Sequence, residues 1–188
     1  MIRIILAAVL LFCAPAAAAQ EDGVPSVIAE AITDETVRAR LAEAEALDME
    51  ADPDGALDAW RAAYDAALAA APDETLALAE IRNQLGAAHF YAGEPEAALG
   101  HFQAAAAAFE GVDELAENRQ EALGNVGSIL SRLGRFAEAE AAQREAFAIR
   151  RDLYPEAHPQ IARSYFELGA LANHQGRAEE AARLVRRA

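Results

Sequence analysis

From about residue 33 onward, small and apolar residues recur every three or four positions between polar ones, which is the spacing of one face of an α-helix. Gly and Pro interrupt this pattern at regular intervals, as in the turn sequence Asp52-Pro53-Asp54-Gly55. Pattern and interruptions together predict helices over about 33–49, 55–71, 73–93, 95–111, 114–133, 135–154, 159–176 and 177–188, with Thr33 as the N-cap of the first.

The predicted helices are related by an internal repeat. Three of them carry an aliphatic residue followed by glycine, with a second glycine seven residues later, and this phrase recurs after 41 and then 42 residues. A period of this size is typical of stacked helical hairpins. We expect the first glycine to allow close helix packing and the second to end the helix in a left-handed conformation. The phrases are Leu85-Gly86 with Gly93, Val126-Gly127 with Gly134, and Leu168-Gly169 with Gly176.

The second helix of each hairpin repeats a different pattern, in which two small residues flank a mostly bulky one on the same face. The small residues let a neighbouring helix approach closely, and the bulky residue fills the space beside them. The small positions are Ala56, Ala98, Ala139 and Ala181 and then Ala63, Ala105, Ala146 and Ala188, and the position between them holds Trp60, Phe102, Gln143 and Val185.

This combination of a Leu-Gly helix with an Ala-x-x-x-aromatic-x-x-Ala helix resembles the tetratricopeptide repeat family, and the longer period, with Tyr154-Pro155-Glu156-Ala157-His158-Pro159 between hairpins, is similar to its kinesin light chain type. The resemblance covers residues 37–188. It implies an all-α solenoid, a right-handed superhelix of antiparallel helix pairs with about four repeats, near 37–72, 73–112, 113–158 and 159–188. The first copy departs from the pattern, because Ala44 and Ala51 stand where the two glycines are expected.

The N-terminus has the features of a secretory signal peptide over residues 1–19, followed by a leader over 20–36. Arg3 precedes a short apolar run, and Ala17-x-Ala19 predicts cleavage after Ala19, so we expect a periplasmic or secreted protein without stable membrane insertion. Phe12 stands where a lipoprotein signal has a small residue, which argues against lipidation of Cys13.

The formal net charge is −15, and all 16 basic residues are arginine. This acidity argues against nucleic acid, which needs a basic face, and against an anionic membrane surface. The absence of lysine and the high alanine content indicate a GC-rich bacterial coding bias.

The sequence predicts no enzyme. It has no nucleophile elbow, HExxH, Walker or Rossmann motif, and its single cysteine lies in the signal peptide. We assign no metal or cofactor, because His89 and His101 on one hairpin lack a third ligand, and His158 and His174 suit helix ends.

We expect a partner to bind the concave side of the solenoid, which the first helix of each pair lines. Amides and arginines there suit the backbone and carboxylates of an extended peptide, and phenylalanines suit its apolar side chains. Asn125 and Arg163 match positions that hold a terminal carboxylate in chaperone-binding family members, but Glu167 and the absence of lysine argue against that ligand. The candidate groove residues are Asn83, Phe90, Asn125, Ser128, Arg132, Arg163, Phe166 and Asn173, beside Ala87, Tyr91 and Ala170.

The sequence therefore predicts a non-catalytic adaptor or scaffold that binds a protein or peptide. Two alternatives stay open. The chain could be an auxiliary solenoid of a cell-envelope enzyme system, or a structural protein that self-associates end to end through its C-terminal repeat.

Overall fold

The computed structural model describes residues 32–188, so the predicted signal peptide and most of the leader lie outside the described residues. Within 32–188 the regular elements are all helical. They are α2 (Glu35–Glu45), α3 (Pro53–Ala70), α4 (Thr75–Tyr91), α5 (Pro95–Ala108), the short 3-10 turn η2 (Asp113–Leu115), α6 (Ala116–Arg132), α7 (Phe136–Leu153), α8 (Pro159–His174) and α9 (Ala178–Val185).

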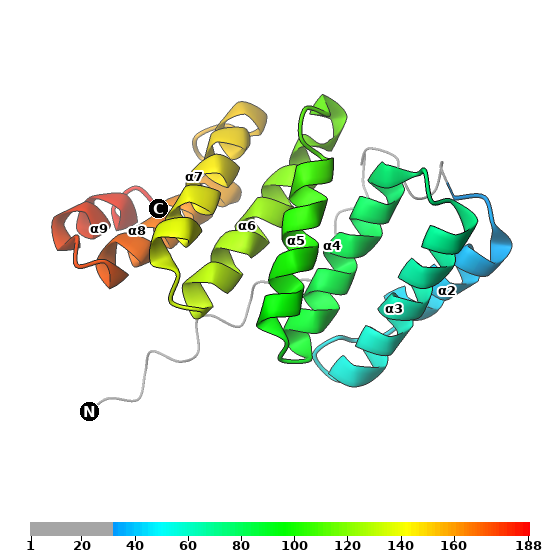
Figure 1. The fold of residues 1–188 in the computed structure, drawn as a ribbon. Helices are drawn as coiled ribbons and strands as arrows, with labels where there is room; N and C mark the ends of the chain where they lie inside the picture. Colours follow the sequence, from blue (N-terminus) through cyan, green and yellow to red (C-terminus); the bar gives the residue numbers. More distant parts are fainter. Residues whose placement is uncertain (1–31) are drawn as a thin grey trace.

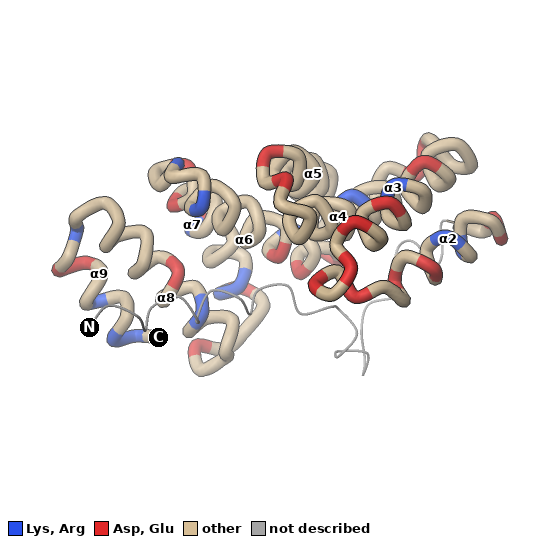
Figure 2. Tube along the Cα trace, turned by 90° about the horizontal axis from the view of Figure 1, so that it is seen from below, with Lys and Arg blue, Asp and Glu red and all other residues tan. Residues whose placement is uncertain are grey.

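The helices stack in sequence order, each packed against the one before and the one after it. Figure 1 shows two layers, one made of α2, α4, α6 and α8 and the other of α3, α5, α7 and α9. Seen along the layers in Figure 2, the stack forms an arch, with the first layer on its inner side. The all-α solenoid predicted from the repeats is confirmed, and we call these layers the inner and outer layers.

The glycines that close each hairpin adopt the conformation predicted for them. Gly93, Gly134 and Gly176 have φ values of 78°, 73° and 76°, a region that L side chains rarely occupy. The residue after each glycine donates its N–H to a carbonyl five residues earlier, as in Arg135 N to Leu130 O at 2.8 Å. This is the Schellman ending of a helix, and it reverses the chain into the outer layer.

The core follows the repeat columns. The alanines of both small columns are buried, apart from the final Ala188. Phe102 of α5 covers Gly86 of α4, and a Cβ at Gly86 would meet its ring at 3.1 Å. The inner and outer helices of a hairpin therefore approach each other because one carries glycine where the other carries a large ring.

The first helix differs from its predicted bounds. Its N-cap is Asp34 rather than Thr33, because the Asp34 carboxylate accepts the N–H groups of Thr36 and Val37. It ends at Glu45 rather than near Met49, where the Asp48 carboxylate instead accepts two backbone N–H groups of a turn. Among residues 32–188, no helix combines the length and the apolar character needed to cross a bilayer.

Candidate functional site

The inner layer presents polar and aromatic side chains on the side of each helix that faces away from the outer layer. Along α6 they recur every three or four residues between buried positions such as Val126 and Ile129. We call this surface the inner face. Its members are Glu80, Gln84, Ala87 and Tyr91 of α4, Glu117, Glu121, Asn125, Ser128 and Arg132 of α6, and Arg163, Phe166, Glu167, Ala170 and Asn173 of α8.

Most of the groove residues predicted from the sequence lie on this face. Asn125, Ser128 and Arg163 are half-buried, and Arg132, Phe166 and Asn173 are exposed. The Ser128 hydroxyl donates to the Gly124 carbonyl at 2.9 Å, so its proton is already engaged.

The two predicted residues of α4 are less accessible. Asn83 is 8% exposed, and its buried Oδ1 has no hydrogen-bond partner among the described residues. Phe90 is half-buried, and the Arg132 guanidinium lies over its ring with the Arg132 Cζ 4.6 Å from the centroid. Phe90 and Arg132 therefore form one cation–π pair that joins α4 to α6.

Phe166 is the most exposed large apolar side chain of the described residues, at 50%. It follows Arg163 by one helical turn on α8, which places an apolar and a cationic side chain side by side on the inner face. Arg163 Nε donates to Glu167 Oε1 at 2.8 Å, so the guanidinium is held along the helix.

A buried arginine lies beneath this part of the inner face. Arg150 of α7 is 1% exposed, and its guanidinium donates to Gln120 Oε1 at 2.6 Å and to Ser164 Oγ at 2.8 Å. Its Nη1 also lies 3.4 Å from Glu167 Oε2. Burial lowers the pKa of Arg150, and the Glu167 carboxylate opposes this shift. The group thus links α6, α7 and α8 through charged hydrogen bonds.

The sequence analysis did not single out Arg150, although its repeat column carries a signal. Arg150 follows Phe109 by 41 residues, so an arginine replaces a buried aromatic residue at the same position of the next hairpin. A Cβ at Gly124 would lie 2.7 Å from Arg150 Nη2, and Gly124 thus leaves room for the guanidinium.

Charges on the inner face also follow a column. Arg38, Glu80, Glu121 and Arg163 are separated by 42, 41 and 42 residues and lie on α2, α4, α6 and α8 in turn. Glu80 accepts a hydrogen bond from Asn118 at 3.3 Å. Desolvation raises the pKa of Glu121, and the positive charges of Arg163 and Arg150 oppose that shift. The column therefore reads positive, negative, negative and positive from one end of the face to the other.

The chemistry available elsewhere is limited. Within residues 32–188, no group of three or more His, Cys, Asp or Glu side chains is arranged to hold a metal ion. His89 and His101 stack with ring centroids 5.0 Å apart, and His89 Nδ1 lies 2.8 Å from Glu94 Oε2. This pair lies at the packing of α4 against α5 and away from the candidate groove residues of α6 and α8.

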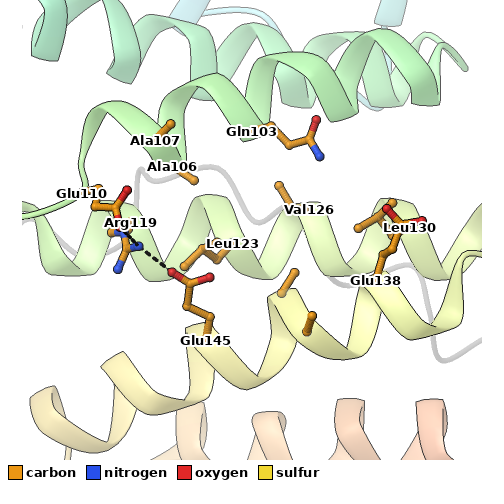
Figure 3. A pocket seen from close by; sticks show the side chains of 12 residues that line it. Gln103, Ala106, Ala107, Glu110, Arg119, Leu123, Val126, Leu130, Glu138 and Glu145 are labelled. Atoms are coloured by element: carbon orange, nitrogen blue, oxygen red, sulfur yellow. Dashed lines mark hydrogen bonds and ion pairs between the residues drawn. The ribbon is translucent and has the colours of Figure 1, made fainter.

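A hollow of about 510 Å³ lies on the opposite side of the stack, between α5 and α7 with α6 as its floor (Figure 3). Leu123, Val126 and Leu130 form the floor and are nearly buried. Arg119 closes one end, where it bridges Glu110 and Glu145 at 3.4 and 2.5 Å. The hollow contains none of the predicted groove residues.

Comparisons with known proteins agree with this architecture. Two family models described as tetratricopeptide repeat match residues 118–188 and 78–110. No curated protein matches the chain.

Solved structures with a similar fold include a kinesin-light-chain-like protein from Podosopora anserina with nearly identical TPR-like repeats, at 16% identity and a TM-score of 0.69, covering 79% of this chain and 71% of that one. BtubC (BKLC) from P. vanneervenii has 20% identity and a TM-score of 0.72, with 80% of this chain and 61% of that chain covered. RapI in its apo form has 16% identity and a TM-score of 0.71, with 79% and 53% covered. At these identities the likeness concerns the fold.

Proposed function

Because this chain belongs to the tetratricopeptide repeat family, whose folds commonly bind protein or peptide partners, we propose that it is a non-catalytic adaptor or scaffold that binds an extended peptide segment on its inner face. The family resemblance inferred from the glycine and alanine columns is thereby confirmed. The partner's place on the inner face is our inference from the side chains there.

Phe166 carries this proposal. A half-exposed phenylalanine on the hollow side of an arch gives an apolar side chain of a partner a place to pack, and an aromatic anchor of this kind commonly dominates a binding interface. Arg163, one turn away, supplies donors for a carboxylate or a backbone carbonyl. Asn125 and Ser128 on the neighbouring α6 add polar groups that suit a peptide backbone.

We further propose that the protein acts in the periplasm or outside the cell. The support is the N-terminal sequence, in which a short apolar run precedes Ala17-x-Ala19. N-terminal sequencing of the protein recovered from the extracytoplasmic fraction tests this, with Gln20 as the expected first residue. A first residue at Met1 would contradict it.

The binding proposal is tested with a library of random 12-residue peptides panned against the chain, followed by titration of selected peptides. Phe166→Ala should weaken binding by about tenfold or more, the loss expected for an interface anchor. Leu68→Ala is the matched control, because Leu68 is 42% exposed but lies on the outer-layer helix α3. Equal affinity of both variants for every selected peptide would place the binding surface elsewhere.

One observation favours self-association as a second candidate. Trp60, Phe102 and Gln143 are at most 3% exposed, whereas Val185, in the same column of α9, is 49% exposed. A second copy that packed against α9 would cover this side chain. Sedimentation at increasing protein concentration tests the idea. A mass that rises with concentration and returns to that of a monomer with Val185→Glu would support it, and a constant mass would exclude it.

A further inference from the structure

The described chain begins at a fixed point on the inner layer. Ile32 is 1% exposed and packs in one core cluster with Val37 of α2 and Trp60 of α3. Its carbonyl oxygen accepts a hydrogen bond from Arg38 Nε at 2.9 Å. Two residues of chain span at most about 7 Å, so Glu30 is tethered within reach of the Arg38 guanidinium.

The sequence just before Ile32 has a charge order that complements the inner face. We call residues 20–31 the pre-helix segment. It carries Glu30 near its end and Glu21 and Asp22 near its start, and the seven residues between them, Gly23 to Ala29, are uncharged. The segment thus reads negative, neutral and negative. The inner-face column that it would cross reads positive at Arg38, negative over α4 and α6, and positive at Arg163.

The lengths of the two patterns also agree. Eight residues separate Glu30 from Asp22, which is about 26 Å for an extended chain at about 3.3 Å per residue. Three steps between neighbouring inner helices, from α2 to α8, span about 24–30 Å at the usual helix spacing of about 8–10 Å. Pro25 favours an extended backbone for the residue before it and for itself, so the sequence supports a strand-like crossing.

We propose that residues 20–31 lie extended across the inner face from α2 to α8, with Glu30 beside Arg38 and with Glu21 and Asp22 beside Arg163. Val24, Val27 and Ile28 then cross the acidic middle of the face without placing a carboxylate next to Glu80 or Glu121. The chain's own N-terminal segment occupies the surface on which the proposed partner binds, and a partner has to displace it.

This arrangement sets the affinity of the site. A segment tethered at Ile32 has an effective concentration of the order of millimolar, and an external peptide therefore competes with a local ligand that is always present. The measured affinity for a partner is reduced by the fraction of molecules in which the face is uncovered. The proposal concerns the same face as the proposed function, but the experiment below contains no partner, so either can fail without the other.

Disulfide trapping tests the crossing. Gly23→Cys is combined with Phe166→Cys on the inner face or with Leu68→Cys on α3 of the outer layer, and Cys13, where present, is replaced by serine. The two partner positions have similar exposure, 50% and 42%. Leu68 follows Ala67, which packs in the same cluster as Ile32, so a segment without a preferred path would reach Leu68→Cys more readily.

We expect Gly23→Cys to form a disulfide with Phe166→Cys at least about tenfold faster than with Leu68→Cys under mild oxidation. A second variant keeps composition and net charge but reverses the order, with Glu21→Val, Asp22→Ile, Val27→Glu and Ile28→Asp. Each exposed ion pair contributes up to about fivefold, so losing two pairs and placing carboxylates against Glu80 and Glu121 should slow the inner-face disulfide by about tenfold.

Each outcome decides the proposal. Faster trapping at the inner face that is lost in the reordered variant supports it. Equal rates at both positions overturn the crossing. Fast inner-face trapping that survives the reordering overturns the charge register on which the proposal depends. Circular dichroism of each variant confirms that the helices are intact, which is expected because the reordered residues precede the first described helix.

Discussion

Replacing Arg150 with alanine should loosen the fourth hairpin from the third. The substitution leaves Gln120 Oε1 buried without its charged donor, a loss of about 1.5–3 kcal/mol for a hydrogen bond to a charged group. It also leaves a cavity where the arginine stem was. Ser164 still donates to Gln160 O at 3.0 Å, and Glu167 still accepts from Arg163, so the damage is partly limited. We expect a total cost of about 3 kcal/mol.

The loss should be local, which the chain makes measurable. The single tryptophan, Trp60, lies in α3 at the other end of the stack and reports on the first hairpin. In urea, the helical signal of the Arg150→Ala variant should fall before Trp60 fluorescence changes, because stacked repeats can lose terminal units first. Hydrogen exchange of the α8 amides should accelerate by roughly 100-fold, the factor that corresponds to about 3 kcal/mol.

Arg151→Ala provides the matched control. Arg151 follows Arg150 directly on α7 but is exposed, with its guanidinium 6.0 Å from the Phe147 ring centroid. Its removal should cost about 0.5 kcal/mol, as at other exposed positions. The reasoning is refuted if the two variants unfold at the same urea concentration and exchange their α8 amides at the same rate, since the buried hydrogen bonds would then contribute nothing measurable.

The sequence predicted those parts of the structure that depend on local geometry. A glycine that ends a helix and an alanine that permits close packing act through the backbone and through volume, and both recur at a fixed period. Gly93, Gly134 and Gly176 could therefore be assigned a positive φ, and the hairpin order could be derived, before any contact was known.

The accessibility of the candidate site depends on position in the stack, which a repeat column does not contain. Asn83 and Phe166 occupy one column, with Gly124 between them, yet they are 8% and 50% exposed. Asn83 belongs to α4, which lies between α2 and α6 in the inner layer, whereas Phe166 belongs to α8 at the end of that layer. Neighbouring helices cover the first residue and leave the second accessible.

The buried polar network was beyond sequence reasoning for a different reason. The partners of Arg150 come from three helices, and Gln120 and Ser164 lie 30 and 14 residues away from it along the chain. Their side chains meet only once the hairpins have packed. An arginine in the column of Phe109 was the one available signal, and it identifies an exception without naming its partners.

Three further predictions concern packing and pH. Gly127→Ala should cost about 1–3 kcal/mol in urea unfolding, because its Cβ would lie 2.7 Å from Gln143 Cγ, and a Gln143→Ala background should remove most of this cost. Burial and a hydrogen bond to Glu117 raise the pKa of Tyr154 to about 12. The unfolded chain ionises first, near pH 10, so stability should fall by about 1–2 kcal/mol between pH 10 and 12, and Tyr154→Phe should remove this fall. Burial, and then the adjacent His89, lower the pKa of His101 below 6.5, and the unfolded chain therefore takes up the proton first as the pH falls. Stability should decrease as the pH drops below about 6.5, and a His101→Gln variant with an equally steep decrease between pH 7 and 5 would show that another group is responsible.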